Sequence, residues 1–559
     1  MNKYSEERKK LQAMGEIPDW FITPGYQLFI EKYLWASSVK EQYKAIAREA
    51  ASYVNNRFDE GEAYNKFFNL LWKGWLSPST PILANMGTTR GLPISCSGGY
   101  IGDSIDGFYT ARREAAILTK HGFGTSGYLG DIRPRGSPIS IGGKASGVLP
   151  VFKGFVRDME EVAQGTNRRG AWAGYLPITH GDFDELCNYL LMHPDGLNVG
   201  WNIPNHFIND LNNGSAEALR RYQKALKTKM VTGKGYFFFV DKANEQKPYS
   251  YKTAELDILA SNLCTEIMLP SNEYYTFTCV LSSMNVAKFD EWQNTDAVYW
   301  STVFLDAVAT SFIDKARWIP GLENAVRFTE EHKALGLGQC GLHTYLQGRG
   351  IPFESLEARW ESNEIARIIQ LQAIRADRDM YDYSTQPIYC DDETSHTHLI
   401  AIAPTKSTAL IMGGISEGIN PDPAVVFGQN TSAGEVERIT PVFLNLMKQR
   451  GVYDKGHIRE IEDAFGSVQG VSWLTPGEKL VFKTAFEMDM KAIIRMASSR
   501  QQYVDQGQSI NLFFAGDATE EYISKCHKMA FNDPNILSLY YCYSKAGVSG
   551  SKEECVACQ

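Results

Sequence analysis

The chain has 559 residues, which is long enough for several ordinary domains or for one very large catalytic domain. Apolar residues make up 43% and charged residues 22% of it, values typical of globular proteins, so a disordered, collagen-like or coiled-coil chain is excluded. The formal net charge of −9 leaves no strongly basic surface, so no nucleic-acid partner is expected.

No apolar run is long enough to cross a bilayer, and the first residues (MNKYSEERKK) lack the apolar core of a signal peptide. We therefore expect a cytoplasmic protein with no membrane partner. The 10 cysteines are too few for a disulfide scaffold. In a reducing compartment, single cysteines are catalytic, metal-binding or simply buried, so their positions carry the information.

The chain divides into three parts by pattern. Residues 1–75 have apolar side chains at three- and four-residue spacing, which predicts a helical N-terminal region. In residues 76–545, short apolar runs alternate with Gly-rich turns and amphipathic helices without a linker, which predicts one large α/β domain. Residues 546–559 are small and polar and predict a flexible tail that ends in C-V-A-C.

A thiol, a carboxylate and an amide lie close together in SNLCTEIMLP. In an extended segment, Asn262, Cys264 and Glu266 point to the same face, whereas in a helix the first two would not. A thiol can act as a one-electron or nucleophilic centre, a carboxylate can accept a proton, and an amide can orient a hydroxyl. The alternative is a half-exposed strand in which the cysteine is a small apolar residue with unrelated neighbours.

Four other cysteines suggest redox chemistry. Cys96 and Cys279 lie in apolar, strand-like runs, where a cysteine is most often buried filler. Cys555 and Cys558 form a terminal CxxC, a spacing whose thiols exchange readily with another disulfide. A mobile dithiol is useful where another pair must be reduced again, so Cys96 with Cys279 is the economical internal pair. No second CxxC or CxxH accompanies the tail, so no metal site is expected.

One glycine motif does not indicate a dinucleotide-binding fold. Residues 121–130 (HGFGTSGYLG) contain a formal GxGxxG match at Gly122, Gly124 and Gly127. No clear strand precedes it and no helix follows it, so it does not meet the context of a dinucleotide-binding loop. We predict a tight loop instead.

Nine short motifs occur in order along the chain: STPIL (79–83), SC with GDS (95–96, 102–104), RPRGSPI (133–139), QGTNRRGA (164–171), NLCTE (262–266), TCVLSSMN (278–285), APTKST (403–408), LYY (539–541) and the terminal CVAC. Together they resemble the large, catalytic subunit of class I ribonucleotide reductase, and the resemblance covers nearly the whole chain from about residue 75. Each motif is weak alone, but the ordered set is highly specific. The resemblance implies a ten-stranded α/β barrel of two five-stranded halves, with a finger loop that carries Cys264 to its centre.

The resemblance also implies the catalytic roles. Cys264 would become a transient thiyl radical that removes hydrogen from C3′ of the ribose. Glu266 would take the proton of the 3′-hydroxyl, and Asn262 would hydrogen-bond the same part of the sugar. Cys96 would protonate the departing 2′-hydroxyl and, with Cys279, supply two electrons as they form a disulfide.

Tyr540 and Tyr541 lie in an apolar run where tyrosines ordinarily only pack. Adjacent residues of a strand face opposite sides, so a stacked pair would require a local distortion. In the family this dyad passes a radical from the dinuclear-metal cofactor of a small subunit to the active-site cysteine. Its presence favours class I over class II, in which adenosylcobalamin generates the radical. The absence of a terminal glycyl-radical motif argues against class III.

The resemblance implies two nucleotide sites, although an ordinary helix cap and a solvated basic loop would explain the same residues. An acidic residue occurs in some relatives where this chain has Lys406. The substrate would contact Thr80, Ser95, Thr405, Lys406, Ser407 and Thr408. A nucleoside triphosphate effector would contact Asp103 and Arg133, with Gln164 and Arg168 relaying its identity.

We therefore predict a ribonucleotide reductase that binds no cofactor of its own. Its expected partners are a small radical-generating subunit, a thioredoxin- or glutaredoxin-like reductant and a ribonucleotide substrate, with diphosphates and a homodimer as the family default. No ATP-cone segment precedes Cys96, so control of overall activity is expected to be absent from this subunit. The alternatives are a class II enzyme and a non-catalytic nucleotide-sensing barrel; the latter would lack the cysteines that this chain has.

Overall fold

A curled sheet organises the molecule, and its first half consists of five parallel strands. A computed structural model describes residues 3–162, 170–431 and 434–545. The strands pair side by side in chain order, because a helical crossover between consecutive strands returns the chain to the same edge of the sheet. They are β2 (Cys96–Tyr100), β3 (Gly124–Tyr128), β4 (Trp172–Pro177), β5 (Asn198–Asn202) and β6 (Tyr236–Phe238).

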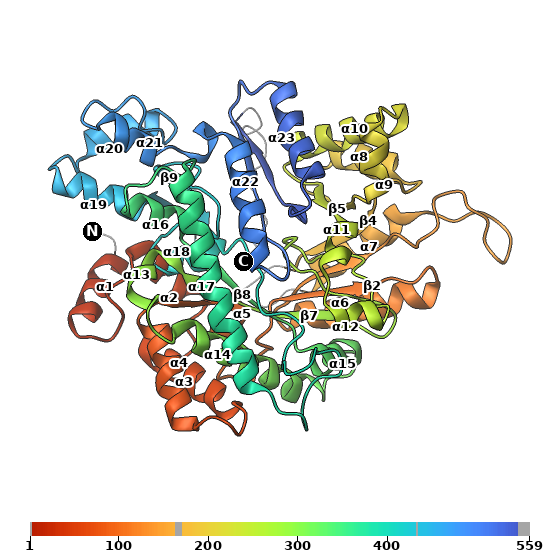
Figure 1. Cartoon of the computed structure of the whole chain (residues 1–559), viewed down its shortest axis with the longest axis horizontal. Coiled ribbons are helices and arrows are strands. Elements are labelled where there is room, and N and C mark those ends of the chain that lie inside the picture. The colour runs from red at the N-terminus through yellow and green to blue at the C-terminus, as the bar shows by residue number, and fades with distance from the viewer. Residues whose placement is uncertain (1–2, 163–169, 432–433, 546–559) are drawn as a thin grey trace.

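Helices cover the outside of this half, on the right in Figure 1. Trp172 of β4 stacks on Phe155 of α7 with ring centroids 4.2 Å apart, which fixes that helix against the sheet. The helices are α6 (Ile105–Lys120), α7 (Val148–Glu161), α8 (Phe183–Met192), α9 (Asn205–Asn212), α10 (Ala216–Thr232), α11 (Val240–Gln246) and α12 (Tyr249–Thr253).

The second half runs antiparallel to the first. β7 (Phe277–Asn285) pairs antiparallel with β2 and with the short β1 (Leu76–Pro78), and parallel with β8 (Leu335–Cys340). The ladder continues through residues 399–402 and 506–510, because Leu337 N–H donates to Leu399 O and Ile402 N–H donates to Gly507 O.

β12 (Ser538–Leu539) closes the ring by pairing antiparallel with β6. The next residue, Tyr540, donates its N–H to Ile510 O at 2.9 Å. Two sets of five parallel segments therefore meet at two antiparallel seams, which confirms the predicted ten-stranded barrel of two halves. β11 (Leu512–Phe514) and β13 (Cys542–Ser544) extend its end as a parallel pair.

The second half contains a long apolar helix, α14, which packs against α15 and α17 and against strands β7 and β8. Nearly all residues of α14 are buried, as expected of a helix that is apolar on every side. The helices of this half are α13 (Phe289–Trp292), α14 (Ala297–Ala316), α15 (Glu323–His332), α16 (Leu342–Gly348), α17 (Leu356–Met380), α18 (Lys406–Ile411), α22 (Met490–Arg500) and α23 (Glu520–Asn532), with single 3₁₀ turns at 286–288, 485–487 and 501–503.

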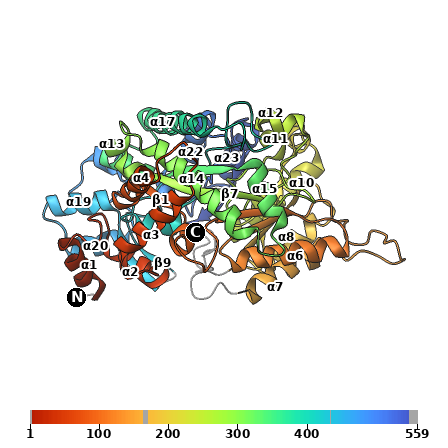
Figure 2. The ribbon, with the colours of Figure 1, turned by 90° about the horizontal axis from the view of Figure 1, so that it is seen from below.

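Four helices precede the barrel: α1 (Lys3–Ala13), α2 (Thr23–Lys32), α3 (Val39–Ser52) and α4 (Glu60–Trp72). The side chains of Ser38 and Asp59 cap α3 and α4 by accepting backbone N–H groups of the first turn. α3 and α4 pack on α14, and a short α5 (Thr80–Asn85) follows β1. Figure 2 shows these helices on the left, away from α6, α7 and α8 on the right.

A small lobe with its own apolar cluster interrupts the second half. The cluster includes Phe443, Met447 and Ile461. In Figure 1 the lobe occupies the upper left. Its elements are β9 (Val426–Thr431), β10 (Gly434–Ile439), α19 (Pro441–Gln449), α20 (Lys455–Asp463) and α21 (Pro476–Val481).

The prediction of a tight loop at the GxGxxG match is wrong, because Gly124–Tyr128 form the inner strand β3. A Cβ atom at Gly127 would lie 2.4 Å from Ile101 and 3.0 Å from Trp172, so the glycine permits close packing of neighbouring strands. The next long helix, α7, begins only at Val148, so the motif is not a strand–loop–helix element. Separately, within the described ranges no helix combines the length and the apolar character needed to cross a bilayer.

Candidate active site

Residues 258–271 form a buried loop that passes through the barrel. A buried backbone needs hydrogen-bond partners, and here polar side chains of the surrounding strands provide them. Hydroxyl side chains from strands of both barrel halves point inward, and their hydrogen bonds hold the loop at the centre of the barrel. The donors are Ser126 Oγ to Ser261 O (2.9 Å), Tyr175 OH to Asn262 O (2.6 Å), Ser509 Oγ to Cys264 O (2.6 Å) and Ser538 Oγ to Thr265 O (2.8 Å).

The tip of this loop is a tight turn, so the predicted extended segment is wrong. Thr265 has a φ of +67°, and Asn262 Oδ1 accepts the N–H groups of Glu266 (3.1 Å) and Ile267 (3.2 Å). The amide, thiol and carboxylate are therefore gathered by the turn and not by strand alternation. Asn262 Nδ2 also donates to Cys96 Sγ at 3.3 Å, which links the loop to β2.

A cavity lies beside the loop tip, and Cys96, Cys264 and Glu266 share it. Asn262 is fully buried but does not line it. Several polar atoms at its wall have no hydrogen-bond partner among the described residues, a rare state for buried groups unless a ligand or water satisfies them. These atoms are Ser79 Oγ, Ser95 Oγ, Ser282 Oγ and Glu266 Oε1. The cavity is therefore suited to a ligand rich in hydroxyl or phosphate oxygens.

Cys96 and Cys279 are register partners across β2 and β7. Directly opposite residues of an antiparallel pair have Cα atoms about 4.5–5.5 Å apart, within the range that a disulfide spans. Both are thiols in the structure. Cys96 lines the cavity, whereas Cys279 lies behind it, fully buried, where Gln506 Nε2 donates to its sulfur at 3.6 Å. Burial raises the pKa of Cys279, which keeps it protonated until an oxidation step removes its proton.

Glu266 can act as a base near neutral pH. Burial raises the pKa of its carboxyl group to about 7, although a hydrogen bond from Ser509 Oγ to Oε2 (3.1 Å) favours the charged form. The other oxygen, Oε1, has no partner within the described ranges. A carboxyl group with this pKa can take a proton from a hydroxyl group in the cavity.

The tyrosine pair lies where the strand is interrupted. β12 ends at Leu539 and β13 begins at Cys542, so Tyr540 and Tyr541 fall in the break and their rings come within 4.2 Å at an angle of 58°. The predicted local distortion is confirmed. Tyr540 OH lies 3.7 Å from Cys264 Sγ, so the phenol and the thiol are close enough to exchange a hydrogen atom.

The residues expected to bind phosphate are only partly at the cavity. Thr80, Ser95, Thr405 and Thr408 line it, whereas Lys406 and Ser407, on the same turn of α18, do not. Thr405 precedes α18 with a φ of +56°, which turns the chain into the cavity wall.

The expected effector residues lie elsewhere. Asp103, just before α6, forms an ion pair with Arg133 at 2.5 Å, and both side chains are partly exposed. Gln164 and Arg168 lie outside the described residues, as do Cys555 and Cys558 of the tail.

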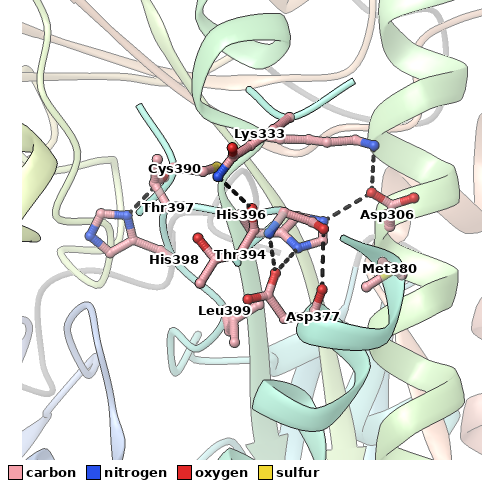
Figure 3. Close-up of polar contacts among 12 residues, drawn as sticks. Asp306, Lys333, Asp377, Met380, Cys390, Thr394, His396, Thr397, His398 and Leu399 are labelled. Atoms are coloured by element: carbon pink, nitrogen blue, oxygen red, sulfur yellow. Dashed lines mark hydrogen bonds and ion pairs between the residues drawn. The ribbon is translucent and has the colours of Figure 1, made fainter. Parts of the chain in front are cut away.

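A buried ion network holds the segment that leads into the cavity wall. His396 lies between Asp306 (2.9 Å) and Asp377 (2.6 Å), and Lys333 reaches Asp306 (Figure 3). Burial alone would lower the pKa of His396, but its hydrogen bonds to the two carboxylates outweigh this and raise it. Three residues later the chain becomes the barrel segment 399–402, whose first N–H groups bind the carboxylate of Asp505.

Sequence reasoning missed several residues of this site. Ser79 and Ser282 were inside quoted motifs (STPIL and TCVLSSMN), and their clustering was an available signal for a polar ligand. Gln506 and Ser509 had no local signal, because more than 200 residues separate them from Cys279 and Glu266.

Two family profiles match this chain. The profile "Ribonucleotide reductase, all-alpha domain" matches residues 23–91, and "Ribonucleotide reductase, barrel domain" matches residues 94–219, 209–380 and 392–541. A Frog virus 3 (isolate Goorha) protein, assigned as a candidate ribonucleoside-diphosphate reductase large subunit, is 33% identical over 534 residues, covering 89% of this chain and 93% of its own.

Two further similarities bear on the class of enzyme. The structure of the Actinobacillus ureae class Id ribonucleotide reductase alpha subunit superposes with a TM-score of 0.85 at 34% identity, covering 97% of this chain and 99% of that one. The vitamin B12-dependent ribonucleoside-diphosphate reductase of Thermoplasma acidophilum is 26% identical over 514 residues, covering 84% of this chain and 64% of that protein.

Proposed function

The chain belongs to the ribonucleotide reductase large-subunit family, and we propose that it reduces ribonucleoside diphosphates with a radical supplied by a small metal-containing subunit. The observation that carries the proposal is the position of Cys264. Its sulfur faces Tyr540 OH at 3.7 Å on one side and shares a cavity with Cys96 and Glu266 on the other.

The reaction follows from these neighbours. A thiyl radical on Cys264 takes the hydrogen atom from C3′ of the ribose. Glu266 accepts the proton of the 3′-hydroxyl, for which a pKa near 7 is suited. Cys96 gives its proton to the 2′-hydroxyl, which leaves as water. Cys96 and Cys279 then supply two electrons and a proton as their disulfide forms, Glu266 returns its proton to the 3′-oxygen, and Cys264 returns the hydrogen atom to C3′.

The barrel also protects the radical. Cys264 is only 5% exposed, and the loop that carries it is buried. Exclusion of water and of outside thiols limits side reactions of a reactive intermediate. The cysteine can be reached through the cavity, where the substrate enters, and through the tyrosine pair, where the radical enters.

Turnover needs outside partners. The disulfide of Cys96 and Cys279 would be reduced by Cys555 and Cys558 of the tail, which a thioredoxin- or glutaredoxin-like protein reduces in turn. Asp103 and Arg133 would bind a nucleoside triphosphate effector together with Gln164 and Arg168, in a homodimer. Thr405 and Thr408, on the cavity wall, would contact the substrate phosphates.

A class II enzyme is the second candidate, because vitamin B12-dependent reductases are among the relatives. The tyrosine pair favours class I, since a cobalamin bound at the cavity would need no phenol behind Cys264. The test is deoxynucleotide formation by the purified chain with a small subunit from the same source, or with adenosylcobalamin alone. Activity that requires the small subunit and is lost in Cys264→Ser is expected; activity with adenosylcobalamin alone would overturn the proposed radical source.

A further inference from the structure

The strand that follows the tyrosine pair carries a third tyrosine, Tyr543. Tyr541 immediately precedes β13 and Tyr543 lies in its middle, while Cys542 between them is only 2% exposed. The rings of Tyr541 and Tyr543 are 5.6 Å apart at an angle of 35°. Tyr540, Tyr541 and Tyr543 therefore form a continuous row of rings that begins at Cys264.

The outer end of this row is held firmly. Tyr543 pairs with Phe513 of β11, and their rings stack at 5.0 Å and 18°. Phe513 in turn packs against Phe486 at 5.5 Å. Such ring contacts restrict a side chain to one orientation, and here they keep Tyr543 beside Tyr541. Tyr540 is 1% exposed, and Tyr541 and Tyr543 are both half-buried. The hydroxyl oxygen of Tyr541 is itself buried, so the row leads from the interior toward the half-buried Tyr543.

We propose that Tyr543 is a further redox-active residue that receives the radical before Tyr541 does. The inference rests on the proposed function. The partner's oxidant takes an electron from Tyr543, whose phenolic proton leaves to water at this half-buried position. The Tyr543 phenoxyl radical then takes an electron and a proton from Tyr541, which restores the Tyr543 phenol. Tyr541 and Tyr540 repeat the step, and Tyr540 takes the hydrogen atom of the Cys264 thiol.

Another tyrosine provides a matched comparison. Tyr236 of β6 contacts Tyr541 at 5.5 Å, as close as Tyr543 does, and contacts Tyr540 at 4.9 Å. It is fully buried, so a radical could reach it only through the pair. Tyr236 therefore lies on a buried side branch, whereas Tyr543 lies at the half-buried end of the row.

The experiment places 3-aminotyrosine, which is oxidised more easily than tyrosine, at position 543 of the full chain. The protein is mixed with the small subunit, a ribonucleoside diphosphate and an effector, and the radical is followed by electron paramagnetic resonance. The decisive protein also carries Tyr541→Phe. If the radical reaches position 543 before position 541, loss of the Tyr541 phenol does not prevent oxidation at 543, so the aminotyrosyl signal at 543 is expected to persist. The same substitution at Tyr236 is expected to give a signal only when Tyr541 is present.

Turnover gives a second readout. Tyr543→Phe keeps the ring stack on Phe513 and is expected to lower turnover about tenfold or more, while Tyr236→Phe stays near the parent rate. An aminotyrosyl signal at 543 that disappears in Tyr541→Phe, or a Tyr543→Phe variant at full rate, would overturn the inference. Cys264→Ser and Tyr541→Phe distinguish a failure of the proposed function from a failure of the role assigned to Tyr543. If both are inactive while Tyr543 proves dispensable, the proposed function stands and only the third tyrosine is refuted.

Discussion

Cys96 and Cys279 face each other across the seam between the two barrel halves, one from β2 and the other from the antiparallel β7. The 182 positions between them in the sequence contain most of the first half-barrel, so only closure of the sheet brings them together. Cys96 reaches the cavity and Cys279 supports it from behind, an arrangement in which one thiol can contact a ligand and the other can close a disulfide.

Replacement of Cys279 by serine tests this pairing. In Cys279→Ser the disulfide cannot form, so we expect repeated turnover to be lost. Thiol titration before and after a reaction without reductant should show the loss of up to four thiols in the parent, because the tail pair can reduce the internal disulfide once, and no loss in the variant. Cys340→Ser is the control, because Cys340 is equally buried on the neighbouring β8 but is paired with Asn285 and not with Cys96. An active Cys279→Ser enzyme would contradict the assignment.

Glu266 should set the acid side of the pH profile. Burial raises the pKa of its carboxyl group to about 7, and the ionised form is the base, so turnover should rise as the pH passes from 6 to 8. Glu266→Gln is expected to lower turnover by about 10²–10⁴-fold, the usual contribution of a positioned base. It should also abolish the acid limb of the profile, which is the rise in turnover between pH 6 and 8.

Glu114 provides the control for this profile. Burial also raises the pKa of Glu114 to about 7, but it lies in a different pocket beside Thr276. The limb should therefore persist in Glu114→Gln. If Glu114→Gln removes the limb and Glu266→Gln retains it, Glu266 is not the base.

The tail cysteines should matter only for the protein reductant. With Cys555→Ser and Cys558→Ser together, we expect turnover to be lost with thioredoxin but retained with a small dithiol, which can enter the cavity and reduce the internal disulfide directly. Cys390→Ser, at a half-buried site away from the cavity, should support turnover with both reductants. Equal activity of the tail variant with thioredoxin would show that the tail is not the relay.

His396 should contribute a pH-dependent share of stability. Replacement by asparagine leaves the carboxylates of Asp306 and Asp377 buried without their shared partner, and we expect the free energy of unfolding to fall by about 3 kcal/mol. Urea unfolding of the two proteins measures this difference. His457→Asn, in a largely exposed pair with Asp454, should change stability by less than about 1 kcal/mol.

The sign of the pH dependence follows from the raised pKa of His396. A histidine with a raised folded-state pKa stabilises the fold fully below its unfolded pKa of about 6.5, and this contribution disappears as the pH rises through the folded value. The difference between the parent and His396→Asn should therefore be largest near pH 6 and smaller at high pH. A difference that grows with pH would show that His396 is buried in the neutral form.

The sequence alone was sufficient for the reactive groups but not for their geometry. Asn262, Cys264 and Glu266 were recognisable from NLCTE. The strand distortion at Tyr540 and Tyr541 followed from the expectation that two adjacent rings contact each other, which they do at 4.2 Å. The extended finger segment was wrong, because tertiary hydrogen bonds to the loop carbonyls stabilise a turn with a positive φ that local pattern does not reveal.

What the order of residues determined by itself is the chemistry available: which thiols, phenols and carboxylates exist, and the alternation of strands and helices that makes a barrel. What only the tertiary structure decided is their environment. The pKa of Glu266, the contact of Gln506 with Cys279 and the row from Tyr543 to Cys264 depend on segments hundreds of residues apart. Burial and electrostatics depend on distance in space, and local sequence patterns carry no record of that distance.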